Sequence, residues 1–186
     1  MIGARHVPLS SAIHDLPRLL LKQDFVAVAS FRRNDHEFDA LDQVCFAASV
    51  RWCAVYPSED RLVCGPFIAP GSGPCFRCFL RRYLCHHAAP ERELCLQRAY
   101  KRDPNLGPRG FLASVAWIAG SMLVATAGMS QAEGGRLMEI NLFDADFLHT
   151  SVVPIHNCSR CRHRVLTRNG DRFVNRLIPS IQNLLA

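Results

Sequence analysis

The chain has 186 residues, 49% of them hydrophobic, which fits a folded domain with a substantial core and excludes wholesale disorder. The formal net charge is +6, but the basic residues are almost all arginine and are scattered, so the charge does not predict nucleic-acid binding. Residues 1–6 lead into no apolar signal region, and nine cysteines without such a signal favour a reducing compartment, by default the cytoplasm.

The first third of the chain predicts a strand–helix–strand unit. Residues 24–31 are a continuous apolar run, typical of a strand buried on both faces, and residues 37–50 carry apolar side chains at helical spacing. The next strands are expected over residues 52–56 and 61–68. This order indicates a βαβ unit with parallel strands, and therefore an α/β fold preceded by a leading arm over residues 1–23.

The second half alternates polar and apolar segments. Residues 84–110 predict a partly helical excursion or crossover loop, and residues 136–142 with 150–155 predict a β-hairpin. Residues 166–186 are expected to form a C-terminal helical tail.

Between the crossover region and the hairpin lies a stretch without charge, residues 111–132. Its length would allow it to cross a bilayer. It is rich in small residues and lacks a basic anchor, so we expect no membrane span. A helix over residues 110–129, buried between the sheet and another subunit, explains it better and predicts a homodimer or a heteromeric complex.

Two Cys-x-x-Cys pairs carry the strongest chemical signal in the sequence: Cys75 with Cys78, and Cys158 with Cys161. Four thiolates in tetrahedral array are typical of a structural zinc site, and a full set of sulfur ligands leaves no position for water or substrate. The interval between the pairs is too long for a zinc finger, so the ion would clip together the ends of a long segment. Either pair alone fits a redox dithiol or a chance spacing equally well.

The remaining cysteines show no paired spacing. Cys85 and Cys95 lie in the polar region, where they are candidates for extra ligands, and His156 beside the second pair is a candidate for a supporting or substitute ligand. Three further cysteines lie in apolar runs and are predicted to be small buried hydrophobic residues: Cys45, Cys53 and Cys64.

The order of these parts resembles the ubiquitin-activating-enzyme-like superfamily typified by ThiF and MoeB. The resemblance rests on residues 70–80 (PGSGPCFRCFL), then the crossover region, the uncharged helix, the hairpin and the second cysteine pair, and it covers residues 24–162. It implies that residues 24–165 are the C-terminal half of a ThiF-like Rossmann-type domain with a structural zinc clip. Adenylating members also carry a Gly-rich phosphate-binding loop; this sequence contains none, so no complete nucleotide-binding half is expected.

Within that superfamily, Arg81-Arg82 after the first pair and the preceding residues 63–71 look closest to the ThiF-like proteins of azole-forming (thiazole/oxazole-modified microcin) peptide biosynthesis. This resemblance implies a non-catalytic, substrate-presenting scaffold for a YcaO-type cyclodehydratase, which uses ATP to close Cys, Ser or Thr side chains into rings. The implied partners are that enzyme, a ribosomal precursor peptide and a flavin dehydrogenase. The leader-binding module usual at the N-terminus of such proteins has no counterpart in residues 1–23.

Two other functions stay open at this point. The chain is alternatively half of a split adenylyltransferase, with Cys85 or Cys95 accepting the acyl group and His86 and His87 as candidate bases. A zinc-stabilised adaptor with no biosynthetic role fits the residues as well.

Overall fold

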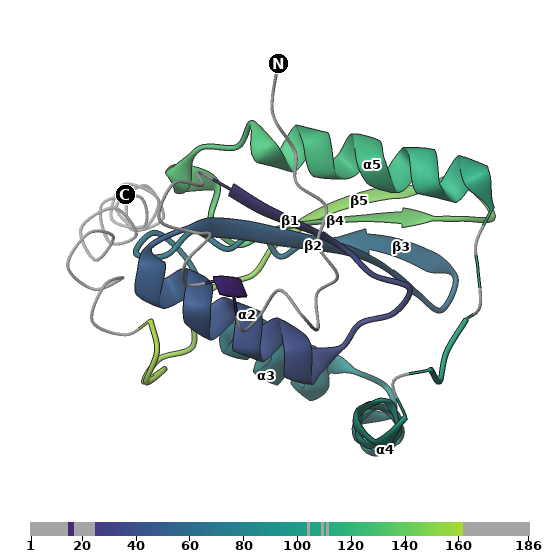
Figure 1. Cartoon of the computed structure of the whole chain (residues 1–186), viewed down its shortest axis with the longest axis horizontal. Helices are drawn as coiled ribbons and strands as arrows, with labels where there is room; N and C mark the ends of the chain where they lie inside the picture. The colour runs from purple at the N-terminus through teal and green to yellow at the C-terminus, as the bar shows by residue number, and fades with distance from the viewer. Residues whose placement is uncertain (1–14, 17–24, 104, 109, 111, 162–186) are drawn as a thin grey trace, which may run out of the picture.

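Five strands form one mixed sheet in the computed structural model, which describes residues 15–16, 25–103, 105–108, 110 and 112–161. Helices α2 and α3 lie on one face of the sheet and α5 lies on the other (Figure 1). The elements are β1 (Phe25–Ala29), α2 (Asp35–Ala48), β2 (Arg51–Ser58), β3 (Arg61–Cys64), α3 (Phe76–His86), α4 (Pro90–Arg102), α5 (Ala113–Ala127), the 3-10 turn η2 (Gln131–Glu133), β4 (Arg136–Asn141) and β5 (Phe147–Ser151). The predicted α/β class is confirmed.

The expected βαβ unit is present as β1, α2 and β2, with β1 and β2 parallel. Helix α2 begins where the Asn34 side chain accepts the Glu37 N–H at 3.4 Å, and it ends at Ser49, whose φ of 57° is left-handed. The prediction that β1 is buried on both faces is wrong. Strand β1 lies at an edge of the sheet, where β2 is its only partner among the described strands. Only Val28 within β1 is buried.

Strand β3 is shorter than the predicted residues 61–68, because the ladder stops at Cys64. Gly65 follows with a φ of +128°, and a Cβ there would lie 2.9 Å from the Arg136 carbonyl oxygen, so glycine is required. Pro66 then lacks an N–H to donate. Strands β2, β3, β4 and β5 pair antiparallel, so parallel pairing is limited to the first two strands.

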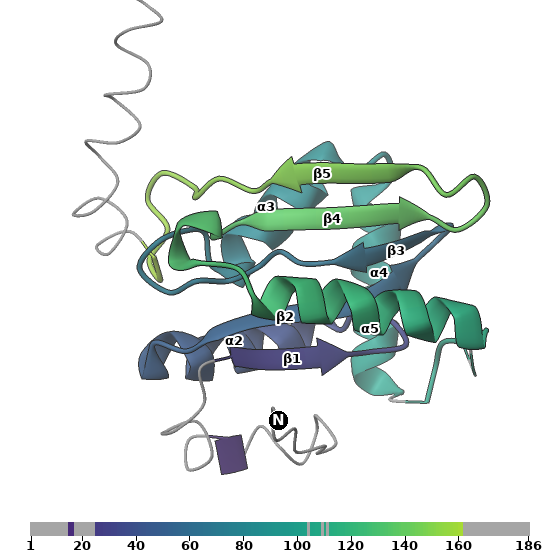
Figure 2. The same ribbon diagram turned by 90° about the horizontal axis from the view of Figure 1, so that it is seen from above.

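The predicted hairpin is confirmed as β4 and β5, but its second strand lies at residues 147–151 and not at 150–155. The turn is tight, because the Asn141 N–H donates to the Asp146 carbonyl oxygen at 2.9 Å. The chain therefore rejoins the sheet at Phe147, earlier than the sequence suggested. Figure 2 shows β5 beside β4 at the edge of the sheet opposite β1.

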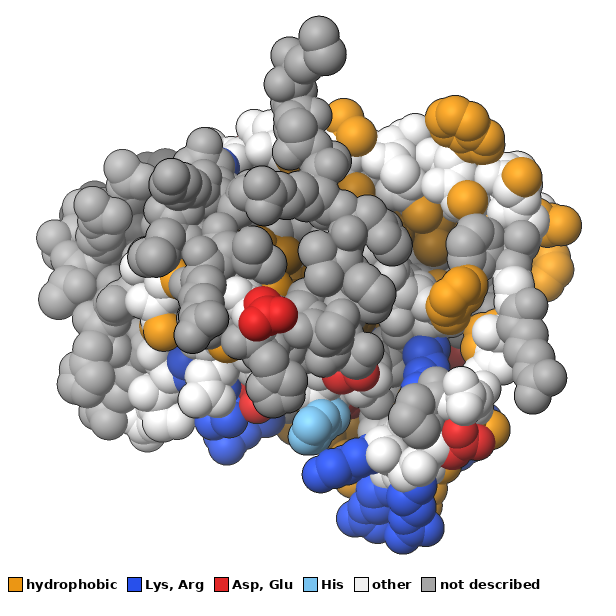
Figure 3. Space-filling model, in the orientation of Figure 1, with side chains coloured by type: hydrophobic (Ala, Val, Ile, Leu, Met, Phe, Trp, Pro, Cys, Tyr) orange, Lys and Arg blue, Asp and Glu red, His pale blue; other side chains and the backbone are white. Residues whose placement is uncertain are grey.

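The predicted helical content of residues 84–110 is confirmed, since α3 runs to His86 and α4 follows from Pro90. The uncharged stretch also forms the expected helix, α5, which turns Met122 and Thr126 toward the sheet. Trp117 and Val124 are 79% and 75% exposed, and Figure 3 shows hydrophobic side chains gathered over α5. The second subunit expected to cover α5 stays a prediction.

Among the described residues, no helix has the length and apolar character needed to cross a bilayer. The proposed C-terminal helical tail, residues 166–186, and most of the leading arm lie outside the described residues.

Two apolar layers sandwich the sheet. On the α5 side, Met122 and Met138 pack with residues of β2 and β3, including Cys53 and Cys64. On the other side, a tight aromatic cluster joins α2, β2 and α3, with ring centroids 5.7–6.1 Å apart: Phe38, Trp52, Tyr56 and Phe76. Because Phe76 follows Cys75 directly, this cluster fixes the position of the first cysteine pair.

Candidate functional site

The structure brings together the four cysteines that the spacing singled out. Their sulfur atoms lie within 4.8 Å of one another, and all four residues are buried. The Sγ–Sγ separations are 3.8 Å from Cys75 to Cys78, 3.5 Å from Cys75 to Cys158 and 3.5 Å from Cys78 to Cys161. The start of α3 and the turn after β5, which are distant in the sequence, therefore meet at the four sulfur atoms.

These separations match the donor set of a tetrahedral metal ion. A Zn–S bond of about 2.3 Å gives a tetrahedron whose sulfur atoms are about 3.8 Å apart. The three separations given above lie within a few tenths of an ångström of this value, and all six lie within 4.8 Å. Four buried sulfur donors also suit a soft or borderline ion far better than calcium or magnesium, which prefer oxygen.

The first pair is positioned by the start of α3. The Cys75 carbonyl oxygen accepts the N–H groups of Cys78 at 3.0 Å and Phe79 at 3.3 Å, which places both sulfurs on the first turn. The N-terminal end of a helix favours negative charge, so this position stabilises thiolates.

The second pair sits in a turn that follows β5. The Cys158 N–H donates to the Ile155 carbonyl oxygen at 3.1 Å, and Asn157 adopts a left-handed φ of 72°. The Ile155 N–H in turn donates to Cys78 Sγ at 3.4 Å. Hydrogen bonds from the Cys161 and Cys75 thiols, assisted by this N–H, lower the pKa of Cys78.

An arginine inside each cysteine pair binds the same helix, a feature that the sequence analysis missed. Arg77 contacts Asp39 at 2.9 Å through two nitrogens, and Arg160 contacts Asp39 at 2.8 Å. Arg160 also pairs with Asp42. The signal was available, because both pairs read Cys-x-Arg-Cys, but nothing local to the sequence identified the carboxylates on α2.

Asp42 is the fully buried centre of this arrangement. Its carboxylate accepts the Trp52 indole N–H at 3.0 Å and the Phe76 backbone N–H at 3.2 Å, besides the guanidinium of Arg160. Burial raises the pKa of Asp42, against the hydrogen bonds that lower it. One carboxylate therefore ties the core aromatic cluster, the start of α3 and the second cysteine pair together.

The other predicted residues lie elsewhere. Cys85 and Cys95 are exposed on α3 and α4, and His156 is exposed; the four-cysteine cluster contains none of the three. The prediction that three cysteines are buried is confirmed for Cys45, Cys53 and Cys64.

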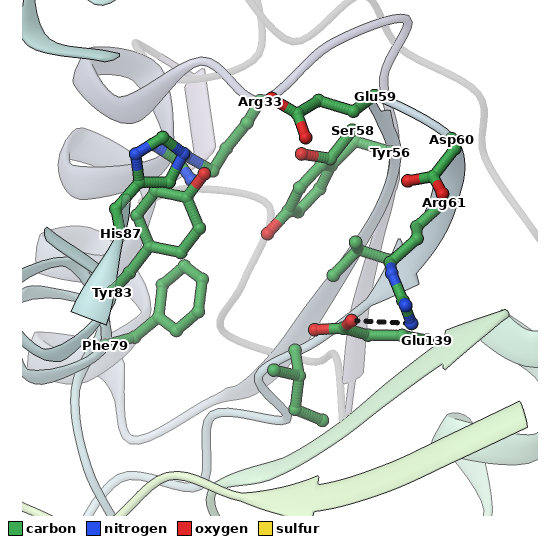
Figure 4. Close-up of a pocket in the computed structure, with 12 residues that line it drawn as sticks. Arg33, Tyr56, Ser58, Glu59, Asp60, Arg61, Phe79, Tyr83, His87 and Glu139 are labelled. Atoms are coloured by element: carbon green, nitrogen blue, oxygen red, sulfur yellow. Dashed lines mark ion pairs between the residues drawn. The ribbon is translucent and has the colours of Figure 1, made fainter. Parts of the chain in front are cut away.

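A separate pocket of about 210 Å³ opens between the sheet and α3, as Figure 4 shows. Its apolar floor consists of Val63, Phe79 and Leu137. Its polar lining comes from the ends of β1 and β2, the β2–β3 turn, α3 and β4: Arg33, Tyr56, Ser58, Glu59, Asp60, Arg61, Tyr83, His87 and Glu139. The sequence did not indicate this pocket, because its residues come from several segments that are distant along the chain, including β3 and the loop after β1.

Neither a protein-family profile nor a curated protein matches this sequence. Solved structures do share its fold. MccB of E. coli, in its structure with ATP, is 16% identical with a TM-score of 0.55 over 86% of this chain and 44% of that one. The heterocyclase TruD is 17% identical with a TM-score of 0.53 over 94% of this chain and 30% of that one.

A heterocyclase solved in complex with substrate and cofactor is also 17% identical, with a TM-score of 0.52 over 91% of this chain and 25% of that one. This chain thus spans less than half the length of each of these proteins. The chain therefore shares its fold with MccB and with two heterocyclase structures, which agrees with the α/β architecture expected from the resemblance.

Proposed function

We propose that Cys75, Cys78, Cys158 and Cys161 hold one structural zinc ion. The support is a buried set of four sulfur donors at tetrahedral separations, with the start of a helix favouring thiolates. With four protein ligands the ion keeps no open position, so its role is to stabilise the fold by closing a long loop.

We further propose that the chain is a non-catalytic scaffold that presents a ribosomal precursor peptide to a YcaO-type cyclodehydratase, which forms thiazole or oxazole rings. The single observation that carries this proposal is a ThiF-like fold in common with heterocyclase structures. A heteromeric complex of this kind gives the exposed apolar side of α5 a partner, and it includes a flavin dehydrogenase as a further component.

The loop after β1 supports a role without nucleotide chemistry. In α/β sheets, ligands bind at the carboxyl ends of parallel strands, where a Gly-rich loop cradles phosphates. Here the loop that follows β1, the first strand of the parallel pair, places Arg33 in ion pairs with Asp35 and Glu93, both at 2.6 Å, and over the Tyr83 ring at 4.0 Å. Those contacts connect α2 to α4, so this loop stabilises the packing of the two helices.

Reconstitution tests this function. The chain by itself is expected to show no ATP–pyrophosphate exchange, whereas its addition to a YcaO partner, precursor peptide and ATP is expected to raise azoline formation, measured by mass spectrometry as the loss of one water per ring. Exchange of pyrophosphate into ATP by the purified chain would overturn the scaffold role. It would favour the split adenylyltransferase, for which the exposed Cys85 and Cys95 supply candidate acyl acceptors.

A further inference from the structure

The pocket beside α3 is too small for a nucleotide but suits one amino-acid side chain. Its volume of about 210 Å³ lies below the range of roughly 300–1,000 Å³ typical of small-molecule sites. The apolar floor, which includes Phe79, and the Tyr83 ring provide a surface for an aliphatic stem. The polar groups lie around this surface (Figure 4).

The Tyr56 hydroxyl points into this space (Figure 4) and has no hydrogen-bond partner among the described residues. Tyr56 is only 2% exposed, and its side chain is directed into the pocket from the end of β2 (Figure 4). Among the described residues no hydrogen bond to its hydroxyl is formed, although its ring packs on Phe38 at 5.8 Å. The Tyr56 oxygen itself is not enclosed, because it reaches the open space of the pocket, and it can therefore accept a hydrogen bond from a guest.

The charges around the pocket favour a cation. Arg33 is already neutralised by two carboxylates, and Arg61 contacts Glu139 at 3.6 Å. Arg92 pairs with Glu59 at the rim. Counting the lining residues together with their ion-pair partners gives five carboxylates against three guanidinium groups: Asp35, Glu59, Asp60, Glu93 and Glu139 against Arg33, Arg61 and Arg92. The pocket is therefore acidic, although the whole chain carries a net charge of +6.

We propose that this pocket binds the cationic side chain, Lys or Arg, of a peptide handled by the protein. The ammonium or guanidinium group contacts the Glu139 carboxylate and donates to the Tyr56 hydroxyl, and its methylene stem lies against Phe79 and Tyr83. The choice of a peptide as the guest rests on the proposed scaffold function. The pocket would then select where along a precursor the chain attaches.

The test uses blocked tripeptides, acetyl-Gly-X-Gly-amide with X as Arg, Lys, norleucine or Glu, titrated into the full-length protein while amide resonances are followed by NMR. We expect Arg and Lys peptides to shift resonances of the β2–β3 turn and α3 and to bind at least tenfold more tightly than norleucine. The Glu peptide is expected not to bind. Equal binding of norleucine, preference for Glu, or shifts confined to other surfaces would each overturn the proposal.

Two variants assign the roles. Glu139→Gln keeps the shape of the side chain and is expected to weaken Arg-peptide binding about fivefold or more, and Tyr56→Phe is expected to weaken it to a smaller extent. Asp144→Asn, in the exposed β4–β5 turn, removes the same charge and is expected to leave binding unchanged. Unchanged binding in Glu139→Gln, with a native NMR spectrum, would contradict the assignment.

The result is separable from the scaffold function because it needs no partner enzyme. Binding of the Arg peptide without azole formation in the reconstituted complex would uphold the pocket and reject the scaffold role. An active complex with no discrimination among the tripeptides would do the reverse.

Discussion

The substitution Asp42→Asn tests whether one buried carboxylate stabilises the protein by linking the four-cysteine cluster to the aromatic core. The change keeps the shape of the side chain but replaces one carboxylate oxygen of Asp42 with an NH2 group, which cannot accept a hydrogen bond. In the wild-type protein the two oxygens accept N–H groups from the Trp52 indole, the Phe76 backbone and Arg160. Arg160 is only 9% exposed, so it loses its buried counter-charge and keeps only Asp39. Removing one partner of a buried pair costs about 3–5 kcal/mol, and the remaining contact to Asp39 moves our expectation to about 3 kcal/mol.

The measurement is urea unfolding of the metal-loaded protein, followed by tryptophan fluorescence and paired with the metal content of each variant. Asp39→Asn is the matched control, because it removes the same charge one turn earlier on α2. Asp39 is 28% exposed, so solvent partly screens its ion pairs with Arg77 and Arg160, and we expect its loss to cost about 1 kcal/mol. If Asp42→Asn destabilised the protein no more than Asp39→Asn does, the buried carboxylate would not connect the core to the cysteine pairs.

Three further predictions concern the cysteines and α5. The purified chain is expected to contain about one zinc ion by elemental analysis, and Cys75→Ser or Cys158→Ser is expected to abolish that content and lower the urea midpoint; unchanged folding without metal would contradict a structural ion. Cys85→Ser and Cys95→Ser are expected to keep zinc content and azole formation in the reconstituted complex, because both residues lie outside the cluster, and loss of activity in either would favour an acyl-accepting thiol. Trp117→Ser is expected to change the stability of the isolated chain by less than about 0.5 kcal/mol, since its side chain is 79% exposed, but to weaken association measured by light scattering; a wild-type chain that is monomeric with and without the candidate partners would refute the interface.

The four-cysteine cluster could be predicted from the sequence because the spacing within each pair is a local signal. A two-residue gap places both sulfurs of a pair on one turn, as at Cys75 and Cys78 at the start of α3. Helical periodicity likewise located α2, and the uncharged stretch located α5, each to within a few residues. The resemblance to ThiF-like proteins, carried by the same cysteine pairs, gave the fold, since it fixed which elements follow one another.

Strand ends and sheet edges were harder to predict, because they depend on pairing between distant segments. The apolar run of β1 looked like a central strand, but the sheet places it at an edge, and β3 stops where Gly65 must pass the Arg136 carbonyl. The second hairpin strand was displaced because the Asn141–Asp146 turn is tighter than its composition suggested.

The amino-acid sequence by itself determined the βαβ unit, the helix α5, the presence of a hairpin and the four sulfur donors, but not the helix α3 that begins at the first cysteine pair, because periodicity and short spacing act within one turn or one strand. Only the tertiary structure decided what those donors lie against. It placed Asp39 and Asp42 of α2 beside Arg77 and Arg160, and it assembled an acidic pocket around the unpartnered Tyr56 hydroxyl. The physical reason is that ion pairs and cavities form between side chains distant along the chain, and their partners are chosen by the way helices pack on the sheet.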